Sequence, residues 1–562
     1  MEVIFKMKNN NWFQDSVVYQ IYPMSFQDSN NDGIGDLNGI TQRLPYLKKL
    51  GVDVLWLNPI YKSPNRDNGY DIADYKQINS TYGTINDFDN LLKETHKHGM
   101  KLLMDLVVNH TSDQHVWFQE SKKAKDNKYT DYYIWRDPVD GHEPNNWNAA
   151  FGGSAWTYVP ARKQYYLHLF APGQPDLNWD NPEVREAVWD IMRFWLDKGV
   201  DGFRMDVINL ISKPQGLPDI PGTATAGTTL GFVADGPRLN EFLRQMNDEV
   251  LSHYDVMTVG EMPGSTPKDA IKYTGFESHE LNMVFQFEHV SLSPNPDVRL
   301  DKWNDEPVKL PELKKALNRW QKALDGKGWN SLYWNNHDQP RAVSRFGNDS
   351  AEFKVRSAEM LGTTLHMMQG TPFVFEGEEL GMTNAHYTSL DQYEDLESIN
   401  AYHELVEQKK IVDGKKMLNY LANMSRDNGR TPMQWNADKN GGFSAVNPWF
   451  ALNPNYKELN VEEELDDKES VFYYYQKLIK LRHESDIIKY GHFEEIDPQD
   501  AEVYAYKRNY KGKTLLVISN FTDKTVSRDY DQANADKLLI SNYGNDTGTK
   551  FRAYETRAYL FE

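Results

Sequence analysis

The feature that most constrains the fold of this chain is a regular alternation of short apolar runs with amphipathic helical stretches. The stretches 37–51, 84–99 and 181–199 repeat their apolar residues at helical spacing, and each ends at a glycine. Runs that are apolar throughout are typical of parallel strands buried on both faces, and eight strand-then-helix units close a (β/α)8 TIM barrel. The eight runs that we predict to be strands are residues 17–23, 52–59, 101–110, 199–207, 256–262, 284–289, 329–338 and 371–380.

A doubly wound open sheet is the alternative arrangement of alternating strands and helices. That fold commonly carries a G-x-G-x-x-G turn after its first strand, and no such motif follows residues 17–23. We therefore favour the α/β barrel, in which the active-site loops follow the C-terminal ends of the strands.

Two segments depart from the barrel pattern. A segment rich in Trp, Tyr, Asn, Gly and Pro separates the third strand from the helix near Asn181, and it far exceeds the ~2–6 residues of an ordinary strand-to-helix loop. We interpret it as an inserted domain over the barrel mouth. Near the C-terminus, short alternating runs such as 503–508 and 514–520 predict an antiparallel β-sandwich. The predicted boundaries are 1–110 with 176–483 for the barrel, 111–175 for the inserted domain and 484–562 for the C-terminal β domain.

Composition excludes several classes of function. The formal net charge of −20 repels phosphate backbones and anionic membranes, so we expect no nucleic-acid partner. The chain has no cysteine, which excludes disulfides, zinc-thiolate sites and cysteine nucleophiles. The N-terminal residues lack the pattern of a signal peptide, and no run approaches the ~18 apolar residues of a membrane span. We therefore expect a cytoplasmic protein with no membrane association and no organic cofactor, whose oligomeric state the sequence does not indicate.

Three of the predicted strands end in a carboxylate: Asp206, Glu261 and Asp338. In a barrel these ends meet at one face, where the chemistry is found. Cleavage of an acetal requires one carboxylate below the anomeric carbon and a second, protonated carboxyl group beside the leaving oxygen. Arg204 lies two residues before Asp206 on the same strand face, and we expect it to keep Asp206 ionised as the nucleophile. We expect the apolar strand before Glu261 and nearby acids to raise its pKa, as suits a general acid.

Five motifs then point to a known family. They are DNGYDIADY (67–75), DLVVNHT (105–111), GFRMDV (202–207), GEM (260–262) and NNHDQPR (335–341). In order and spacing they resemble the conserved regions of the α-amylase superfamily, glycoside hydrolase family 13. RDNGRTPMQW (426–435) and FEGEELGMTN (375–384) are similar to its oligo-1,6-glucosidase and dextran glucosidase branch.

The resemblance implies a retaining α-glucosidase and a role for each matching residue. Asp206 would be the nucleophile, Glu261 the acid/base and Asp338 the stabiliser of the transition state. Taken alone, Asp71 is equally compatible with an Asx turn and Arg430 with a surface cation. The residues that the resemblance places around the non-reducing glucose in subsite −1 are Asp71, His110, Phe170, Arg204, His337 and Arg430.

Val207, directly after the nucleophile, carries the substrate preference. In the resembling family a valine there accompanies α-1,6 cleavage, although a β-branched residue could equally pack the barrel core. We therefore expect exo-acting hydrolysis of α-1,6-glucosidic bonds at the non-reducing ends of isomaltooligosaccharides, panose or short dextran. The sequence departs from the family's pattern at Glu376, where a glutamine is common and an extra carboxylate could change the acceptor side.

Other functions stay open at this point. A sucrose isomerase or transglucosylase would use the same intermediate, and an α-1,4-glucosidase would share the catalytic acids. An arginine-rich clamp of the isomerase type is not evident, since 341–347 contains only Arg341 and Arg345. Non-catalytic transporter subunits of the superfamily need a membrane anchor, and a carbohydrate-binding protein would not require the three acids.

The loop DSNNDGIGD (28–36) predicts a calcium site. Oxygen ligands occur at alternate positions with glycine at the sixth, as in calcium loops. The twelfth position is Gly39 and not glutamate, and no helix precedes the loop, so it is not an EF-hand. Because the loop follows the first strand, away from the catalytic acids, we expect the Ca²⁺ to be structural; a loop of Asx turns without metal is the alternative. The predicted ligands are Asp28, Asn30, Asp32, the Ile34 carbonyl and Asp36.

Overall fold

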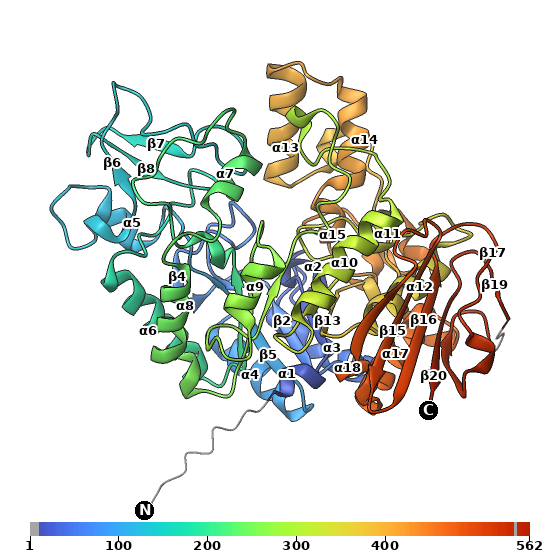
Figure 1. The fold of residues 1–562 in the computed structure, drawn as a ribbon. Coiled ribbons are helices and arrows are strands. Elements are labelled where there is room, and N and C mark those ends of the chain that lie inside the picture. Colours follow the sequence, from blue (N-terminus) through green and yellow to red (C-terminus); the bar gives the residue numbers. More distant parts are fainter. Residues whose placement is uncertain (1–10, 545–547) are drawn as a thin grey trace, which may run out of the picture.

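The computed structural model describes residues 11–544 and 548–562. Its centre is a sheet of eight strands in the order β11-β10-β9-β5-β2-β1-β13-β12, and every ladder in it is parallel. Each predicted apolar run contains or overlaps one of these strands, so the α/β barrel is confirmed (Figure 1). The strands are β1 (Val18–Ile21), β2 (Val54–Leu57), β5 (Lys101–Val107), β9 (Gly202–Asp206), β10 (Met257–Glu261), β11 (Met283–Phe285), β12 (Ser331–Leu332) and β13 (Thr371–Phe375).

Side chains join the two ends of this sheet. The Ser331 hydroxyl donates to the Val284 carbonyl at 2.7 Å, and the Tyr333 hydroxyl donates to the Gln286 carbonyl. These bonds connect β12 to β11 without a backbone ladder, because β12 contains only two residues. The sheet therefore forms a barrel in which one seam depends on side-chain donors.

The predicted helices pack around the barrel. In α3 (Leu37–Leu50) the Asp36 carboxylate caps the N-terminus by accepting from the Gly39 N–H, and Gly51 ends the helix with φ 100°. A left-handed residue at this position favours glycine, which has no Cβ. The helices α4 (Ile85–Lys97) and α6 (Pro182–Asp197) correspond to the predicted stretches 84–99 and 181–199.

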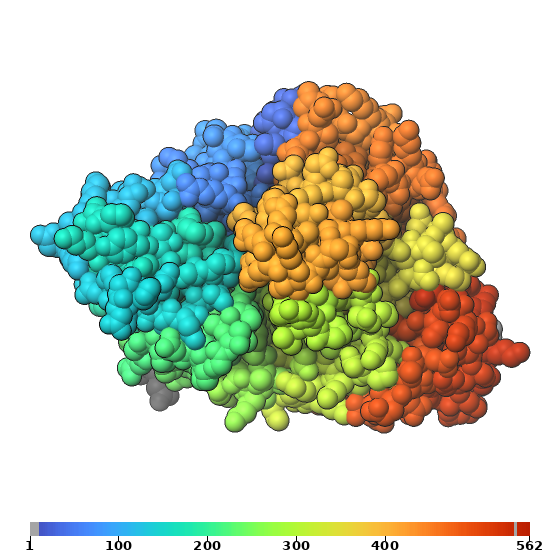
Figure 2. All heavy atoms as spheres, turned by 90° about the horizontal axis from the view of Figure 1, so that it is seen from above, coloured from blue at the N-terminus to red at the C-terminus, as the bar shows by residue number. Residues whose placement is uncertain are grey.

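Two segments rise above the C-terminal ends of the barrel strands (Figure 1). One follows β5 and contains α5 (Val116–Ser121) and a small sheet of β6 (Trp135–Arg136), β8 (Gln164–Leu167) and β7 (Trp156–Val159). The other follows β13 and contains α13 (Leu396–Tyr402), the π-helix η7 (His403–Gln408) and α14 (Gly414–Met424). Seen from above, the two segments lie side by side (Figure 2), and the Asn400 amide donates to the Phe151 carbonyl at 3.1 Å.

An antiparallel sheet occupies the C-terminal part of the chain. Its order is β14-β15-β16-β20-β18, and β17 (Val526–Ser527) pairs with β19 (Lys550–Phe551) beside it. The five strands are β14 (His492–Ile496), β15 (Val503–Tyr510), β16 (Lys513–Asn520), β20 (Thr556–Phe561) and β18 (Lys537–Ser541). The predicted C-terminal β domain is thereby confirmed in its fold class.

Among the described residues, no helix is both long enough and apolar enough to cross a membrane. The N-terminal segment that we expect to lack a signal peptide falls largely on residues 1–10, outside the described residues.

Candidate active site

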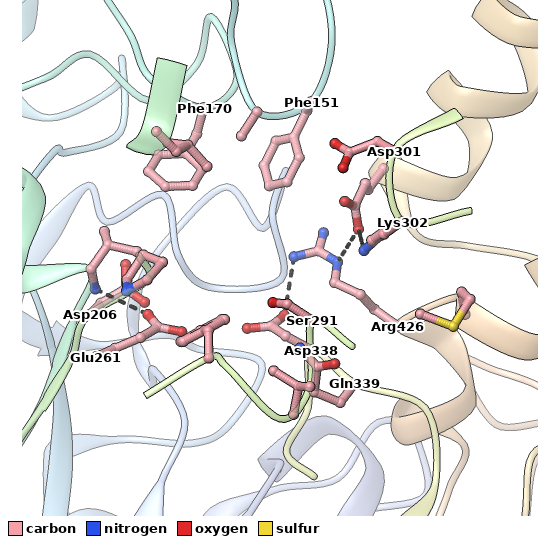
Figure 3. Close-up of a pocket in the computed structure, with 18 of the residues that line it drawn as sticks. Phe151, Phe170, Asp206, Glu261, Ser291, Asp301, Lys302, Asp338, Gln339 and Arg426 are labelled. Carbon is pink, nitrogen blue, oxygen red and sulfur yellow. Dashed lines mark hydrogen bonds and ion pairs between the residues drawn. The ribbon is translucent and has the colours of Figure 1, made fainter. Parts of the chain in front are cut away.

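The three predicted catalytic acids meet at one cavity. Asp206 is the last residue of β9, Glu261 is the last residue of β10, and Asp338 follows β12. All three line a cavity of about 310 Å³ above the barrel. Figure 3 shows Asp206 and Glu261 side by side, with Asp338 across the cavity and Phe151 and Phe170 above them.

A buried arginine holds the first two acids together. One guanidinium nitrogen of Arg204 lies 2.7 Å from Asp206 and 2.8 Å from Asp105, and the other lies 2.7 Å from Glu261. The Val207 N–H also donates to Glu261 at 3.0 Å. Arg204 is fully buried, so its charge acts in a medium that screens it little. Its two nitrogens therefore fix the spacing between Asp206 and Glu261.

Burial sets the protonation of these acids. Desolvation raises the pKa of Glu261 to about 8, although Arg204 acts in the opposite direction. Burial also raises the pKa of Asp206, to about 7, against the lowering effect of Arg204. The predicted contact between Arg204 and Asp206 is present, but desolvation outweighs it, so the pKa of Asp206 is raised and not lowered.

Asp338 lies in a different electrostatic environment. Burial alone would raise its pKa, but His337 and two arginines reverse the shift and hold the pKa of Asp338 well below its usual range. Arg430 lies 2.8 Å and Arg426 lies 3.1 Å from the same carboxylate oxygen, and His337 lies 3.1 Å from the other. Asp338 is therefore a permanent anion opposite the protonatable Glu261.

Besides the three acids, three further residues predicted from the family resemblance line the cavity: His110, Phe170 and Val207. The rings of His110 and Phe170 pack with centroids 5.2 Å apart. Burial lowers the pKa of His110 to about 4, so its imidazole is neutral near pH 7. A neutral imidazole beside an aromatic ring suits a hydroxylated, uncharged ligand.

Arg204, His337 and Arg430 lie below the cavity, where they support residues that line it. Arg430 is not the surface cation of the alternative interpretation, since it is 1% exposed and bonds to Asp338. The His337 ring stacks on Tyr70 at 5.2 Å with an interplanar angle of 6°. These residues hold the cavity floor in position.

Asp71, a fourth predicted substrate contact, does not line the cavity either. Its buried carboxylate accepts from the Ser63 hydroxyl at 2.9 Å and from the N–H groups of Arg66 at 3.1 Å and Asp67 at 3.2 Å. These bonds form the polar turn that was the alternative interpretation. The carboxylate of Asp71 therefore bonds within its own loop and not at the cavity surface.

Asp67 and Arg426 line the cavity instead, and the sequence analysis did not single them out. Arg426 lies 3.5 Å from Asp67 and 2.5 Å from Asp395, in addition to its contact with Asp338. Asp67 is the first residue of the motif DNGYD and Arg426 the first residue of RDNGR, and this position in a family motif was the sequence signal that could have identified them. The motifs alone do not show which of their two acids or two arginines faces inward.

Glu376 is fully buried and does not line the cavity. Its carboxylate therefore makes no direct contact with the acceptor side of the cavity, and an indirect effect on that side stays a prediction.

The loop 28–36 is folded by its own carboxylates. Asp28 accepts from the N–H groups of Asn30, Asn31 and Gly33 at 2.7–3.0 Å. Asp36 caps α3. Within residues 11–544 and 548–562, no group of three or more acidic or histidine side chains is arranged to hold a metal ion. Asx turns account for these contacts, and the calcium site stays a prediction.

Comparison with known proteins places the whole chain in one group. Residues 20–491 match the family described as "Alpha amylase, catalytic domain". The chain is 54% identical over 560 residues to an oligo-1,6-glucosidase of Halalkalibacterium halodurans, covering 98% of this chain and 99% of that one. A crystal structure of Bacillus licheniformis trehalose-6-phosphate hydrolase superposes with a TM-score of 0.91 at 48% identity, covering 98% and 100%. An isomaltulose synthase from Protaminobacter rubrum superposes with a TM-score of 0.94 at 41% identity, covering 98% and 99%.

Proposed function

The chain belongs to the α-amylase family of glycoside hydrolases, and from this premise we propose that it is a retaining, exo-acting α-glucosidase for α-1,6 bonds. Its substrates would be the non-reducing ends of isomaltooligosaccharides, panose or short dextran. The observation that carries the proposal is the arrangement of Asp206, Glu261 and Asp338 in one cavity, with the first two on a single guanidinium.

The proposed reaction has two steps. Asp206 attacks the anomeric carbon while Glu261 gives its proton to the leaving glycosidic oxygen, which forms a glucosyl ester on Asp206. Glu261, now a carboxylate, then takes a proton from water as that water attacks the ester and releases glucose. Retaining enzymes keep these carboxyl groups about 5–5.5 Å apart, against about 6.5–9.5 Å in inverting enzymes. The shared contact with Arg204 favours the shorter separation.

The cavity wall explains why the proposed action is at chain ends. Asp67 and Arg426 form an ion pair at the cavity, and their polar atoms suit the hydroxyls of a terminal glucose. His110, Tyr70 and Phe170 complete the wall, while Arg204, His337 and Arg430 act from below. We assign the contact first predicted for Asp71 to Asp67. A wall built this way forms a pocket for one glucose.

Preference for the α-1,6 linkage rests on Val207 and on the relatives. Val207 lines the cavity beside Asp206, where its branched side chain narrows the path of the leaving sugar. The flexible exocyclic linkage of an α-1,6 bond fits such a restriction better than an α-1,4 bond. The similar proteins named oligo-1,6-glucosidase support the same choice.

The cavity charges argue against a phosphorylated substrate, although a trehalose-6-phosphate hydrolase is among the similar structures. Of the described lining residues, Lys302 and Arg426 are the cations, and each is paired: Lys302 with Glu397 at 2.5 Å, and Arg426 with Asp338 at 3.1 Å. A phosphate would find no unpaired cation among them and would face six acids. The acids that line the cavity are Asp67, Asp206, Glu261, Asp301, Asp338 and Glu397.

A sucrose isomerase is the second candidate, favoured by the similarity to isomaltulose synthase. The arginines of the 341–347 region do not serve as a clamp, because Arg341 and Arg345 both donate to backbone carbonyls. Isomerisation would require the released fructose to stay bound beside the glucosyl ester. Product analysis separates the two reactions.

The test compares isomaltose, panose, dextran, maltose and sucrose in parallel. We expect glucose release from isomaltose and panose to exceed release from maltose, with sucrose giving no isomaltulose. Asp206→Asn should lower turnover of p-nitrophenyl α-glucoside by at least about 1,000-fold, while Asp190→Asn on the exposed face of α6 should not. Retained turnover in Asp206→Asn would refute the nucleophile, and isomaltulose as the main product from sucrose would favour the second candidate.

We also propose that loop 28–36 holds a structural Ca²⁺ through the predicted ligands. The supporting observation is the chemistry of the donor set, which is oxygen only and includes the buried carboxylates of Asp28 and Asp36. Removal of the metal with EDTA, confirmed by elemental analysis, should lower the Tm, and added CaCl2 should restore it. An unchanged Tm after complete removal would leave the Asx turns as the whole structure of the loop.

A further inference from the structure

Three glutamates lie buried just after β13, behind the floor of the cavity. Glu376 and Glu379 are 0% exposed, and Glu378 is 5% exposed. Glu378 and Glu379 begin the short helix η5 (Glu378–Leu380). None of the three lines the cavity, and the reaction proposed above uses none of them. Because a buried carboxylate needs compensation, their protonation requires an explanation.

The three carboxyl groups differ in the number of donors that reach them. Glu379 accepts from the hydroxyls of Tyr19 at 2.8 Å and Tyr46 at 2.6 Å, and from the Gly377 N–H at 2.9 Å. Glu378 accepts from the Tyr475 hydroxyl at 3.0 Å, and its second oxygen has no partner among the described residues. Of the three glutamates, Glu379 therefore accepts the most hydrogen bonds, and its ionised form is the best stabilised.

Glu376 has the fewest donors for a group with no exposure. One oxygen accepts from the Tyr22 N–H at 2.7 Å, and the other has no hydrogen-bond partner within the described part of the chain. A carboxylate in this position would leave charge on an oxygen that nothing stabilises. A carboxylic acid would keep the bond from Tyr22 through its carbonyl oxygen and carry no charge.

One cation faces the three glutamates. Arg341, which follows β12, donates to the Glu376 backbone carbonyl at 2.5 Å and to the Asn428 carbonyl at 3.1 Å. Within the described residues it forms no ion pair with any of the three side chains, so its charge acts from a distance. Among the described residues, Tyr19 on β1 is the other titratable group that faces Glu376, and Glu378 and Glu379 are the acids on its own segment. The single positive charge of Arg341 can balance only one ionised carboxylate. Glu379 is the glutamate whose ionised form has enough hydrogen-bond donors.

Glu376 reaches the active site through Tyr22. The Tyr22 ring stacks on His337 with centroids 6.0 Å apart, and the Arg430 guanidinium lies 5.7 Å from its centre. His337 and Arg430 in turn hold Asp338. The bond between Glu376 and the Tyr22 backbone therefore fixes the end of β1 beneath the transition-state stabiliser.

We propose that Glu376 is a positioning residue that carries a proton at neutral pH and, as a neutral acid, fixes Tyr22 beneath the glucose pocket. Glu378 carries a second proton, and Glu379 holds the charge that balances Arg341. In support, burial raises the pKa of Glu376 well above its usual value and that of Glu378 to about 8. The raised pKa of Glu379 is opposed by hydrogen bonds from both tyrosines.

Stability against pH provides the first test. The pKa of Glu376 is higher in the folded than in the unfolded protein. Its contribution to the free energy of unfolding is therefore fully present below about pH 4.5 and declines as the pH rises toward the pKa of the folded protein. Glu376→Gln stays neutral and keeps the acceptor for Tyr22. Its Tm should equal that of the wild type near pH 4.5 and exceed it increasingly above, by about 1 °C per pH unit. A Tm for Glu376→Gln that falls below the wild-type value at pH 7, or a difference independent of pH, would overturn the proposal.

Matched variants in the same cluster sharpen this test. Glu379→Gln replaces an acceptor oxygen with a donating amide where the hydroxyls of Tyr19 and Tyr46 and the Gly377 N–H all donate, so it should lower the Tm at pH 7. Glu378→Gln should raise the Tm, with a smaller pH dependence than Glu376→Gln. The infrared spectrum gives a direct signature, because the carbonyl stretch of a protonated carboxylic acid at neutral pH should diminish in Glu376→Gln. If that spectral band is unchanged, Glu376 is ionised and the proposal fails.

Kinetics test the positioning role. Glu376→Leu removes the acceptor for the Tyr22 N–H and should lower kcat on p-nitrophenyl α-glucoside at least 10-fold at pH 6, whereas Glu376→Gln should keep it within twofold. Glu378→Gln, whose partner Tyr475 lies on α17 (Val471–Glu484), is the control with unchanged kcat. Equal kcat for the leucine and glutamine variants would refute the role. This arm rests on the proposed α-glucosidase function, whereas the Tm and infrared arms do not, so the two failures are distinguishable.

Discussion

At the scale of single residues, the proposed reaction requires one ionised and one protonated carboxyl group side by side. Arg204 contacts both Asp206 and Glu261 at 2.7 Å, so the arginine alone does not distinguish them. Their other neighbours differ, because the charges of Asp206 and Asp338 oppose ionisation of Glu261, whereas the charge of Asp105 opposes ionisation of Asp206. The pair loses its first proton more readily than its second, which gives one anion and one acid in the same site.

This requirement predicts a bell-shaped pH dependence. The nucleophile must be ionised, so kcat/KM for isomaltose should fall as the pH drops through the raised pKa of Asp206, about 7. The acid must be protonated, so kcat/KM should also fall as the pH rises through the pKa of Glu261, about 8. Initial rates of glucose release between pH 5 and 10 at constant ionic strength measure both limbs.

The leaving group supplies the control for this profile. p-Nitrophenolate leaves without protonation, so the alkaline limb should weaken with p-nitrophenyl α-glucoside while the acidic limb stays. Identical alkaline limbs for the two substrates would contradict the assignment of Glu261 as general acid.

Val207 is the residue at which backbone strain and the proposed linkage specificity coincide. Its φ of 34° and ψ of 41° are unusual for a β-branched residue, and its N–H donates to Glu261. Val207→Ala removes two methyl groups from the cavity wall and should raise the ratio of kcat/KM for maltose to that for isomaltose by about 10-fold.

A second cavity-lining valine controls for lost volume. Val290 lies in the loop after β11, and Val290→Ala should affect both substrates alike. An unchanged ratio in Val207→Ala would show that the linkage preference arises elsewhere in the cavity.

At the scale of elements, the strands were predictable and the walls of the cavity were not. A strand buried on both faces, such as β2, is apolar along its whole length, so local sequence indicates it. The carboxylates at strand ends stand out for the same reason. The pair of Asp67 and Arg426 joins positions 359 residues apart, and no local pattern indicates which residues meet across that distance.

The exchange of Asp71 for Asp67 shows the same limit within one loop. Both acids belong to the motif DNGYD, and only the folded turn reveals that Asp71 accepts from the backbone N–H groups of Arg66 and Asp67. The family resemblance located the loop but not the direction of each side chain. Side-chain direction depends on the loop conformation, which spacing in the sequence does not determine.

The contact between α13 and the inserted segment predicts a limit on substrate length. The Asn400 amide bonds to the Phe151 carbonyl, and the Phe151 ring covers the Arg426 guanidinium at 5.0 Å. Asn400→Ala should loosen this side of the mouth and raise kcat/KM for short dextran relative to isomaltose about threefold, as expected for the loss of about one hydrogen bond.

An exposed position on the same segment supplies the control. Gln408→Ala, at the end of η7, should leave the ratio of the two substrates unchanged. A ratio that responds equally to both variants would attribute the effect to the segment's stability and not to the bond with Phe151.

At the scale of the whole molecule, the C-terminal sheet braces the barrel from outside the active site. The Tyr506 hydroxyl donates to the Thr364 carbonyl on α12 (Lys354–His366) at 2.7 Å, and Arg508 donates to the Met367 carbonyl at 2.6 Å. These contacts join polar groups of the sheet to the end of a barrel helix. The sheet therefore contributes to stability, while the cavity is built by the barrel and the two segments above it.

Lys314 on α10 (Leu310–Leu324) links the barrel to this sheet through three hydrogen bonds. Its side chain is fully buried, and its ammonium donates to the carbonyls of Asp497, Asp500 and Val503 at 2.5–3.1 Å. Lys314→Met keeps the length of the side chain but leaves three buried carbonyls without a donor, which should cost about 3 kcal/mol and lower the Tm by about 3 °C. Because these carbonyls belong to the segment that leads into β15, limited proteolysis should cut the C-terminal sheet faster, while kcat on isomaltose below the unfolding temperature should stay unchanged.

Lys315→Met on the exposed face of the same helix should change none of these quantities. A Tm for Lys314→Met equal to that of Lys315→Met would mean that apolar packing, and not the buried ammonium, holds the sheet against the barrel.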